Sequence, residues 1–564
     1  MAKVYGIDLG TTYSAIATLN DMGMPEVIEN FADSSLLLAS AVYFPDGGEP
    51  VIGEAAKTQA EVTPERVVQY VKRDIGKSDA IVREFDGVKY DPISTSSLIL
   101  KRMKEYAEEQ GHKVNDVVIT CPAYFGGEER VATKQAGELA GFNVLNIVNE
   151  PTAAALNYCI REFKENRKIM VYDLGGGTFD ITLFDFAVDE EGRATIDVID
   201  SGGNDQLGGI DWDARLENYI CELYADENGI SLDEIDGPLH QLIKTQVEGV
   251  KQAISNMPSK SFTVNYDGDA TRLEVSREKF EEITQDLVGQ TLSFVHNLME
   301  TVNVSTEEVD VVLLVGGSTK MPMIKAAVEE IFPGKVRVEQ PDLAVAKGAA
   351  LSAATEWNQR IVKQLENQSN HYGGESELFD EELPPITEEE AANLMINVPQ
   401  QVSTVEDKLT RSLGPAVVIE GEYMIDNLLF IGDEIPADAK EVYGTLIENQ
   451  PEVMVNVFEN VGRDRVNKHI VPCLDRSGEE QYTDPSLKVK KIGEVRLVLP
   501  PNTAKNSPIE VYFRSSTKGL EVRAMNVNTG EVAEEIITSE NTYTSEEMLE
   551  AKERLEAIRT SGQI

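Results

Sequence analysis

The sequence predicts an α/β domain with a duplicated core, followed by an all-β domain and one short helix. Strands and helices alternate over the first half of the chain, which is the pattern of an α/β domain. Two related strand–turn–strand segments, Val4–Leu19 and Ile169–Phe184, carry Asp-Leu-Gly at the turn. The composition changes after Trp357, and β-rich runs separated by turn residues follow between Val417 and Val527.

Composition and charge narrow the classes of function. The chain has 564 residues, 41% of them hydrophobic and 26% charged, which indicates more than one globular domain. The net charge of −47 argues against nonspecific binding to nucleic acid or to an anionic membrane, because both need a basic surface. We see no long apolar run and no signal-peptide pattern, so we expect a cytoplasmic protein. The four cysteines and five histidines show no metal-type spacing, and reduced, buried thiols are expected.

The two glycine hairpins are the first candidate site. In the first, Asp8 ends a strand before Gly10-Thr11-Thr12, and in the second, Asp173 ends a strand before three glycines. Glycine lets the backbone approach a phosphate closely and point N–H groups at it, and an acidic residue beside it can hold a hydrated Mg²⁺. Each hairpin alone is equally well an ordinary turn, in which Asp8, Asp173 or Asp180 caps the chain. Two related copies favour one shared phosphate cleft.

The remaining elements of the first domain follow in order. Hydrophobic periodicity predicts helices at 98–110, 128–140, 151–158, 239–256, 276–301, from 322 and at 342–355, and strands at 115–121, 144–150 and 310–315. Further glycine turns stand at Gln206–Asp213 and Gly316–Thr319. The two commonest nucleotide signatures, GxxxxGK[ST] and GxGxxG between strand and helix, are absent from the sequence.

Several polar residues have an ordinary interpretation beside a functional one. Glu150 precedes a proline that opens a helix, where a negative charge is favourable without any ligand. Lys72 carries no local signature and, alone, is typical of a surface lysine. Glu248, Lys251 and Ser255 share one face of a helix, and such a face is more often exposed than bound to a ligand.

The second half begins with an acidic stretch at 367–390 that predicts a linker. Strands are expected at 453–458, 493–499, 509–514 and 519–527. Near the end, Thr544 and Glu547 form a capping-box pattern. The apolar stripe of the helix that follows comprises Met548, Leu549, Leu555 and Ile558. The expected divisions are an α/β domain at 1–360, an acidic linker at 361–405, a β domain at 406–535 and a helical tail at 536–564.

The quoted motifs together resemble a known family. They are IDLGTTYS at 7–14, VKRDIG at 71–76, CPAYF at 121–125, NEPTAAAL at 149–156, YDLGGGTFDIT at 172–182 and LLVGGSTKMP at 313–322. In this order they are similar to the 70-kDa heat-shock (DnaK-type) chaperones, over residues 4–355. The resemblance implies an α/β actin-like (duplicated ribonuclease-H-like) ATPase domain, followed by an all-β sandwich that holds a short extended apolar peptide.

The resemblance also implies roles for residues. The implied catalytic residues for hydrolysis of ATP to ADP are Lys72, Glu150, Asp173, Thr178 and Asp180. They would act mainly by positioning and by charge neutralisation. Asp8 and Asp173 would orient Mg²⁺ through its waters, with K⁺ nearby. Pro122 and Arg130 would couple the nucleotide and peptide sites. The implied nucleotide-binding residues are Gly10, Thr11, Thr12, Tyr13, Gly175, Gly176, Gly177, Thr178, Gly208, Gly209, Glu248, Lys251, Gln252, Ser255, Gly316, Gly317, Ser318, Lys320 and Asp342.

The chain departs from the family pattern in several places. Gln252 and Lys320 stand where the family usually has arginines around the adenine, and neither stacks like a guanidinium. The family's short apolar linker is not recognisable, and Leu394-Met395-Ile396 is the only apolar cluster of the acidic segment in its place. The chain stops after one helix, so we expect a nearly absent lid and weak, fast-exchanging or few clients. Its final residues, SGQI, carry no acidic docking tail.

Three classes of function remain open from the sequence. The leading hypothesis is an ATP-dependent chaperone for unfolded or extended polypeptides, acting in protein folding with a J-domain co-chaperone and a nucleotide-exchange factor. The alternative is a nucleotide-regulated scaffold or sensor of the actin superfamily, whose β domain binds one dedicated partner. A sugar-kinase type of enzyme shares the phosphate hairpins, but the β domain and the missing sugar-site motifs disfavour it. Stimulation of ATP hydrolysis by varied apolar peptides separates the first two.

Overall fold

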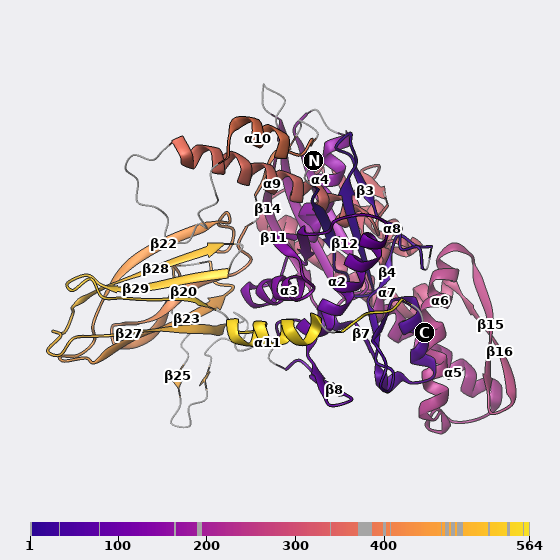
Figure 1. The fold of residues 1–564 in the computed structure, drawn as a ribbon. Helices are drawn as coiled ribbons and strands as arrows, with labels where there is room; N and C mark the ends of the chain where they lie inside the picture. Colours follow the sequence, from indigo (N-terminus) through magenta and orange to yellow (C-terminus); the bar gives the residue numbers. More distant parts are fainter. Residues whose placement is uncertain are drawn as a thin grey trace.

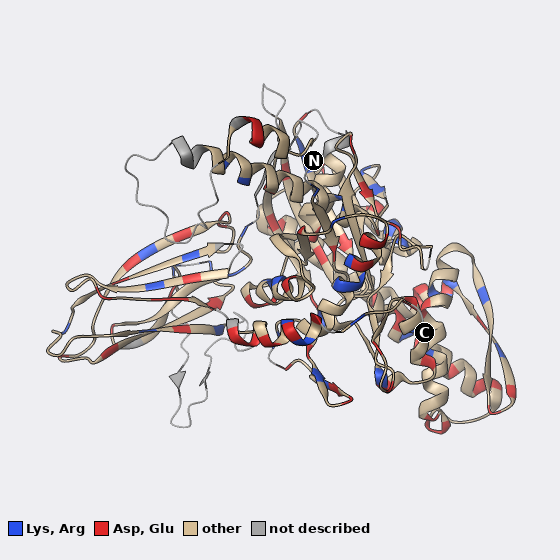
Figure 2. Cartoon of the chain, viewed as in Figure 1, with Lys and Arg blue, Asp and Glu red and all other residues tan. Residues whose placement is uncertain are grey.

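An α/β part and a β sandwich lie side by side in the computed structural model of the chain (Figure 1). The structure describes residues 3–562 except 33, 78, 163–164, 189–193, 339, 370–385, 399–401, 407, 464, 468–472, 475–479, 482–488, 517–518, 538–541 and 557. Helix α11 (Ser545–Glu556) runs from the sandwich back along the α/β part (Figure 1). Acidic residues are spread over both parts rather than gathered in one patch (Figure 2).

Two six-stranded sheets form the centre of the α/β part. The path of the first sheet is β11 (Asn143–Asn149), β10 (Asp116–Cys121), β1 (Tyr5–Asp8), β2 (Tyr13–Leu19) and β3 (Pro25–Val27), with β4 (Leu38–Ala39) paired to β2. The path of the second is β18 (Val336–Val338), β17 (Val311–Val315), β12 (Arg167–Leu174), β13 (Phe179–Val188), β14 (Ala194–Asn204) and β19 (Val402–Glu406). In each sheet, three neighbouring strands pair in antiparallel fashion, and two further strands are added in parallel at one edge. The halves therefore repeat one arrangement, as the paired Asp-Leu-Gly hairpins predict.

Helices α4 (Glu150–Glu162) and α9 (Ala344–Ser369) pack against each other between the two sheets. Their facing sides are rich in alanine, which lets the backbones come close: a Cβ on Gly348 would lie 1.7 Å from the carbonyl oxygen of Ala153. The other long helices of the α/β part are α2 (Pro92–Glu109), α3 (Gly127–Leu139), α5 (Gly209–Asn228), α6 (Gly237–Asn256), α7 (Arg277–Val302) and α8 (Pro322–Ile331). The two hairpins open at the same side of this α4–α9 layer.

Smaller elements complete the α/β part. A three-stranded sheet contains β5 (Ala41–Tyr43), β6 (Val51–Ile52) and β7 (Val67–Gln69), and helix α1 (Glu54–Thr58) follows β6. The 3₁₀ helix η3 (Val71–Asp74) carries Lys72. The hairpins are β8 (Arg83–Phe85) with β9 (Val88–Tyr90) and β15 (Ser259–Tyr266) with β16 (Asp269–Ser276). Helix α10 (Glu388–Leu394) follows the acidic stretch.

The β sandwich has two main sheets. One contains β24 (Val466–Asn467), β21 (Glu422–Asp426), β20 (Ser412–Ile419), β23 (Glu452–Asn460) and β27 (Lys490–Val498) in that order. The other contains β22 (Ala437–Gly444), β28 (Pro508–Ser516), β29 (Gly519–Asn526) and β30 (Val532–Ile537). A small hairpin joins β25 (Cys473–Leu474) and β26 (Glu480–Gln481). The side chains of Val457, Val495, Phe513 and Val522 meet in the buried core.

Several elements differ from the sequence-based expectations. Helix α2 begins at Pro92 rather than at 98, because Asp91 caps it there with a hydrogen bond from the N–H of Ser94. The turn expected at Gln206–Asp213 contains the start of helix α5 at Gly209. Strand β19 lies inside the expected linker and pairs in parallel with β14, so this segment extends the sheet of the α/β part. Most of the acidic stretch, at 370–385, lies outside the described residues.

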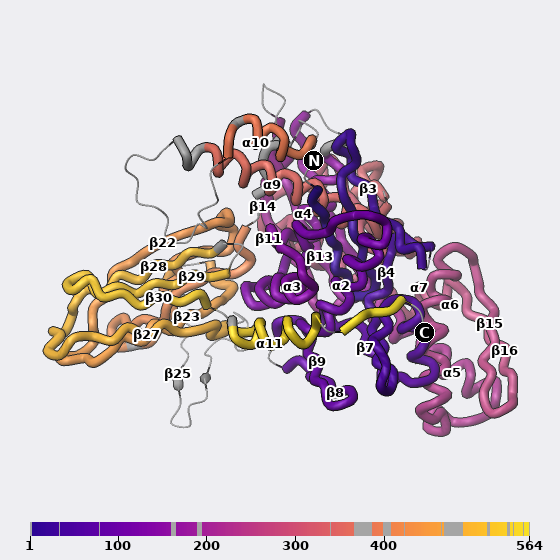
Figure 3. Tube along the Cα trace, in the orientation of Figure 1, coloured from indigo at the N-terminus to yellow at the C-terminus, as the bar shows by residue number. Residues whose placement is uncertain are grey.

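The C-terminal segment packs on the α/β part rather than on the sandwich. Its capping box is present, since Glu547 accepts a hydrogen bond from the N–H of Thr544 at 2.8 Å. Leu555 is buried in the core of the first sheet, whereas Leu549, expected in the same stripe, is 60% exposed. Lys101 donates a hydrogen bond to the carbonyl of Leu555 at 2.9 Å. Figure 3 shows this segment following the surface of the α/β part to the C-terminus.

Polar contacts between described residues join the sandwich to the α/β part. Lys490 on β27 forms an ion pair with Glu128 on α3. Arg463 pairs with Asp200 at 3.2 Å, and the hydroxyl of Thr410 donates to the carbonyl of Phe125 at 3.3 Å. None of the helices that the structure describes combines the length and hydropathy needed to cross a membrane.

Candidate functional site

A cavity of about 630 Å³ opens between the two halves of the α/β part, and both glycine hairpins line it. The hairpins touch each other there, because a Cβ added to Gly176 would lie 1.9 Å from Oγ1 of Thr12. The second hairpin is fixed from behind by helix α5, whose Gly209 and Ile210 N–H groups donate to the carbonyls of Gly175 and Gly176 at 3.0 and 2.8 Å. Only glycine permits this approach, which brings two backbone turns to one point.

Buried acidic residues surround one lysine at the bottom of the cavity. Lys72 is 4% exposed and forms an ion pair with Glu150, the first residue of α4. Burial acts to lower the pKa of Lys72, but the negative charges of Glu150 and Asp8 outweigh it and raise the pKa. Lys72 is therefore a charged lysine, held by η3 against the end of β11 and the start of α4.

The aspartates at the hairpins carry raised pKa values. Burial, followed by repulsion from Glu150, raises the pKa of Asp8 to about 7. The same causes raise the pKa of Asp173 and Asp180 well above the ordinary value. One lysine does not neutralise this set of carboxyl groups, so a bound cation would be strongly favoured here.

The residues present fit a hydrated Mg²⁺ ion. Asp8 and Asp173 line the cavity beside the hairpins, where the phosphates of a nucleotide would lie. Among the described residues, no three acidic, histidine or cysteine side chains converge closely enough to bind a metal directly. Mg²⁺ commonly keeps several waters and takes its remaining ligands from one or two carboxylates and from phosphates, so this donor set suits it.

The other end of the cavity is lined by α6. Glu248 receives hydrogen bonds from Tyr13 at 3.4 Å and from Gln252 at 3.1 Å, and it forms an ion pair with Lys57. Lys251 donates to Asp213 at 2.8 Å and to the carbonyl of Gly209 at 3.0 Å. These bonds fix polar side chains around a space that can take a sugar or a base.

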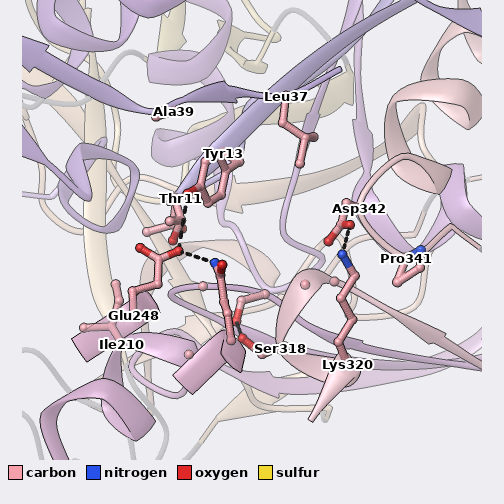
Figure 4. Close-up of a pocket in the computed structure, with 18 of the residues that line it drawn as sticks. Thr11, Tyr13, Leu37, Ala39, Ile210, Glu248, Ser318, Lys320, Pro341 and Asp342 are labelled. Carbon is pink, nitrogen blue, oxygen red and sulfur yellow. Dashed lines mark hydrogen bonds and ion pairs between the residues drawn. The ribbon is translucent and has the colours of Figure 1, made fainter. Parts of the chain in front are cut away.

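A further ion pair lies on the opposite side of the cavity. Lys320, at the end of the 3₁₀ turn after β17, pairs with Asp342. Figure 4 shows this pair on the side of the cavity facing away from Glu248 and Tyr13. Lys320 contacts Asp342, and Gln252 donates a hydrogen bond to Glu248.

Most of the predicted site residues line this cavity. They are Asp8, Gly10, Thr11, Thr12, Tyr13, Lys72, Glu150, Asp173, Gly175, Gly176, Thr178, Gly209, Glu248, Lys251, Gln252, Ser255, Gly316, Gly317, Ser318, Lys320 and Asp342. Gly177 and Asp180 belong to the second hairpin and Gly208 packs against it: a Cβ on Gly208 would meet the backbone of Gly177, and Asp180 accepts a hydrogen bond from the N–H of Ala123 at 3.1 Å.

The two predicted coupling residues lie outside the cavity. Pro122 precedes Ala123, whose N–H binds Asp180, so it stands beside the acidic cluster. Arg130 on α3 binds Asn149 and donates to the carbonyl of Phe125 at 3.2 Å. It lines a separate cavity, between the α/β part and the sandwich.

Sequence reasoning assigned no role to several other residues of the site, although Arg73 lies in the VKRDIG motif and Asp213 in the Gln206–Asp213 turn. Lys57 on α1 reaches Glu248, and Arg73 donates to the carbonyl of Gly177 at 2.9 Å and pairs with Asp211. Tyr70 and Asp213 also line the cavity. Their partners are far away in the sequence, and only the folded chain brings them together.

Comparisons with known proteins show which proteins the chain is similar to. The Hsp70 protein family model matches residues 4–366. The chain is similar to the chaperone protein DnaK of Thermotoga neapolitana and of Thermotoga maritima, in each case 40% identical over 360 residues, covering 62% of this chain and 59% of the relative. It is also similar to the chaperone protein DnaK of Thermosipho melanesiensis, 32% identical over 557 residues, covering 97% of this chain and 82% of the relative.

Proposed function

This chain belongs to the Hsp70 family, and we propose that it is a molecular chaperone that binds and hydrolyses ATP to control its grip on extended polypeptide segments. The observation that carries the proposal is the contact of the two glycine hairpins in the same cavity that Lys72 and the buried carboxylates line. The likeness to the two Thermotoga relatives spans 59% of their length.

In this proposal the hairpins hold the phosphates of the nucleotide with their backbone N–H groups. Lys72 neutralises charge on the terminal phosphate, and Glu150 and Asp180 orient the attacking water. Asp8 and Asp173 would hold Mg²⁺ through its waters, the ion would supply charge neutralisation at the phosphates, and K⁺ is proposed as a second ion. Thr178, the residue before β13, places its hydroxyl beside the same phosphates. Positioning and charge neutralisation are the main tasks in phosphoryl transfer, and these residues supply both.

At the other end of the cavity, we propose that the adenosine lies between the side that carries Glu248 and the side that carries the Lys320–Asp342 ion pair. Glu248, Lys251 and Ser255 supply polar groups for the ribose, and Gln252 and Lys320 lie along the base. The pocket stays an ATP site in this proposal, with weaker base stacking than two arginines would give.

The β sandwich is the proposed peptide-binding part, acting with a J-domain co-chaperone and an exchange factor. The likeness to the Thermosipho relative covers 97% of the chain and so includes the sandwich, which favours a chaperone over a scaffold with one dedicated partner. The proposed division into 1–360, 361–405, 406–535 and 536–564 follows the sequence, with β19 as the segment that ties the linker to the α/β part.

The test is steady-state ATP hydrolysis by the full chain. We expect Lys72→Ala and Thr178→Ala each to lower turnover by at least about a hundredfold, because each removes a group that acts on the transferred phosphate. An unfolded apolar peptide should stimulate the wild-type chain. Unchanged turnover in both variants would overturn the ATPase proposal, and turnover without peptide stimulation would favour the scaffold.

A further inference from the structure

A group of acidic residues lies at the interface between the α/β part and the sandwich. Glu459, on β23, is 9% exposed and lines a cavity of about 140 Å³ between the two parts. Its Oε2 has no hydrogen-bond partner among the described residues. A Cβ added to Gly126 would lie 3.1 Å from this oxygen and 3.1 Å from Oε2 of Glu129, so two carboxyl groups from different parts of the chain face the same point.

The surrounding charges do not neutralise Glu459. Lys490 forms its ion pair with Glu128, and Arg130 donates its hydrogen bonds to Asn149 and to the carbonyl of Phe125. No ion pair within 4.0 Å joins Glu459 to a cation among the described residues. The charged groups that face it or line the same cavity are Glu128, Glu129 and Arg130 on α3, Glu356 on α9, Lys408 and Arg411 before β20, and Lys490 on β27.

We propose that Glu459 is a proton switch for docking of the β sandwich: the docked arrangement is favoured when its carboxyl group is protonated and is weakened when that group ionises. Docking brings Glu459 out of water and places it beside Glu129, and both changes oppose the ionised form. Undocking returns the carboxylate to water and separates it from Glu129, so the two arrangements differ in proton affinity at this one site.

The direction of the pH dependence follows from what raises the pKa of Glu459 in the docked form. Burial, then repulsion from Glu129, raises the pKa of Glu459 from 4.5 to about 7. Between pH 4.5 and about 7, the docked form therefore binds more protons than the undocked form, and docking is strongest at low pH. The docking equilibrium constant should fall by about tenfold per pH unit as pH rises towards 7, and change little above it.

Small-angle X-ray scattering of the full nucleotide-free chain between pH 5.5 and 8 tests this, because undocking enlarges the radius of gyration. We expect the wild-type chain to expand as pH rises and Glu459→Gln to stay compact throughout. Glu452→Gln is the matched control: Glu452 begins the same strand, pairs with Arg496 at 2.7 Å, and should leave the wild-type pH response intact.

Two further variants separate a proton switch from a purely structural role. Glu129→Gln removes the facing negative charge, so the ionised docked form is less unfavourable and the chain should stay compact to higher pH. Arg411→Gln removes an attracting positive charge and should make the expansion at high pH more complete. A wild-type chain whose dimensions do not change with pH would overturn the proposal. So would a Glu459→Gln chain that keeps the wild-type response.

Discussion

At the scale of single residues, Gly176 meets Thr12 where the two hairpins touch. We expect Gly176→Ala to abolish nucleotide binding and to lower the free energy of unfolding by about 1–3 kcal/mol, because its Cβ would overlap Oγ1 of Thr12 and force the hairpins apart. Titration with a fluorescent nucleotide and urea unfolding measure the two effects.

The control is Gly289→Ala, in the exposed face of α7, where a Cβ meets nothing within 4 Å. A helical Gly→Ala change there should raise stability by up to about 1 kcal/mol and leave nucleotide binding alone. If Gly176→Ala bound nucleotide as tightly as this control, the hairpins would not form the phosphate site.

Lys320 and Gln252 make a second prediction about single residues. Replacing both by arginine should strengthen binding of ADP by about 0.5–2 kcal/mol, because a planar guanidinium stacks on a base face and an ammonium or amide does not. Isothermal titration calorimetry measures the change. Lys325→Arg, on the exposed side of α8, is the matched control, and equal affinities in the two variants would place the base elsewhere.

At the scale of elements, α11 is held by few side chains. Leu555 is 1% exposed within the core of the first sheet, and Leu555→Ala should lower the free energy of unfolding by about 2–4 kcal/mol and release the helix. Leu549→Ala, at an exposed position of the same helix, should cost almost nothing. Hydrogen exchange of α11 checks this, and equal protection in the two variants would show that Leu555 does not anchor it.

Elements with strong local signals were predictable from the sequence, and others were not. The hairpins after Asp8 and Asp173 combine an apolar strand with glycine, and both features act over a few residues. Helix α5 begins at Gly209 inside a segment whose glycines favour a turn, and its start depends on bonds to the carbonyls of Gly175 and Gly176. Strand β19 is short, and only its pairing with distant β14 makes it a strand.

The same distinction holds for the site. The residues found from sequence lie in motifs, whereas Lys57 lies in none and acts through a partner 191 residues away. Arg73 lies within the VKRDIG motif, but its contact with Gly177, 104 residues away, follows only from the fold. Side-chain pairs of this kind follow from how the two halves close on each other. No window of the sequence contains that information, and for the same reason the contacts between α3 and the sandwich were not predicted.

At the scale of the whole molecule, the ion pair between Lys490 and Glu128 ties the sandwich to α3. Lys490→Glu should place a fourth acidic group beside Glu128, Glu129 and Glu459 and drive the two parts away from each other. We expect peptide stimulation of ATP hydrolysis to be lost while basal hydrolysis persists, because neither Lys490 nor Glu128 lines the nucleotide cavity.

The reciprocal exchange makes this prediction specific to the pair. In the double variant Glu128→Lys with Lys490→Glu, opposite charges face each other again, so stimulation should return in large part, with a coupling free energy of about 0.5–3 kcal/mol in a double-mutant cycle. A structural defect caused by either substitution alone would not be repaired in this way. If the double variant were no better than Lys490→Glu, the ion pair would not carry the coupling, and the contacts of Arg463 and Thr410 would have to carry it.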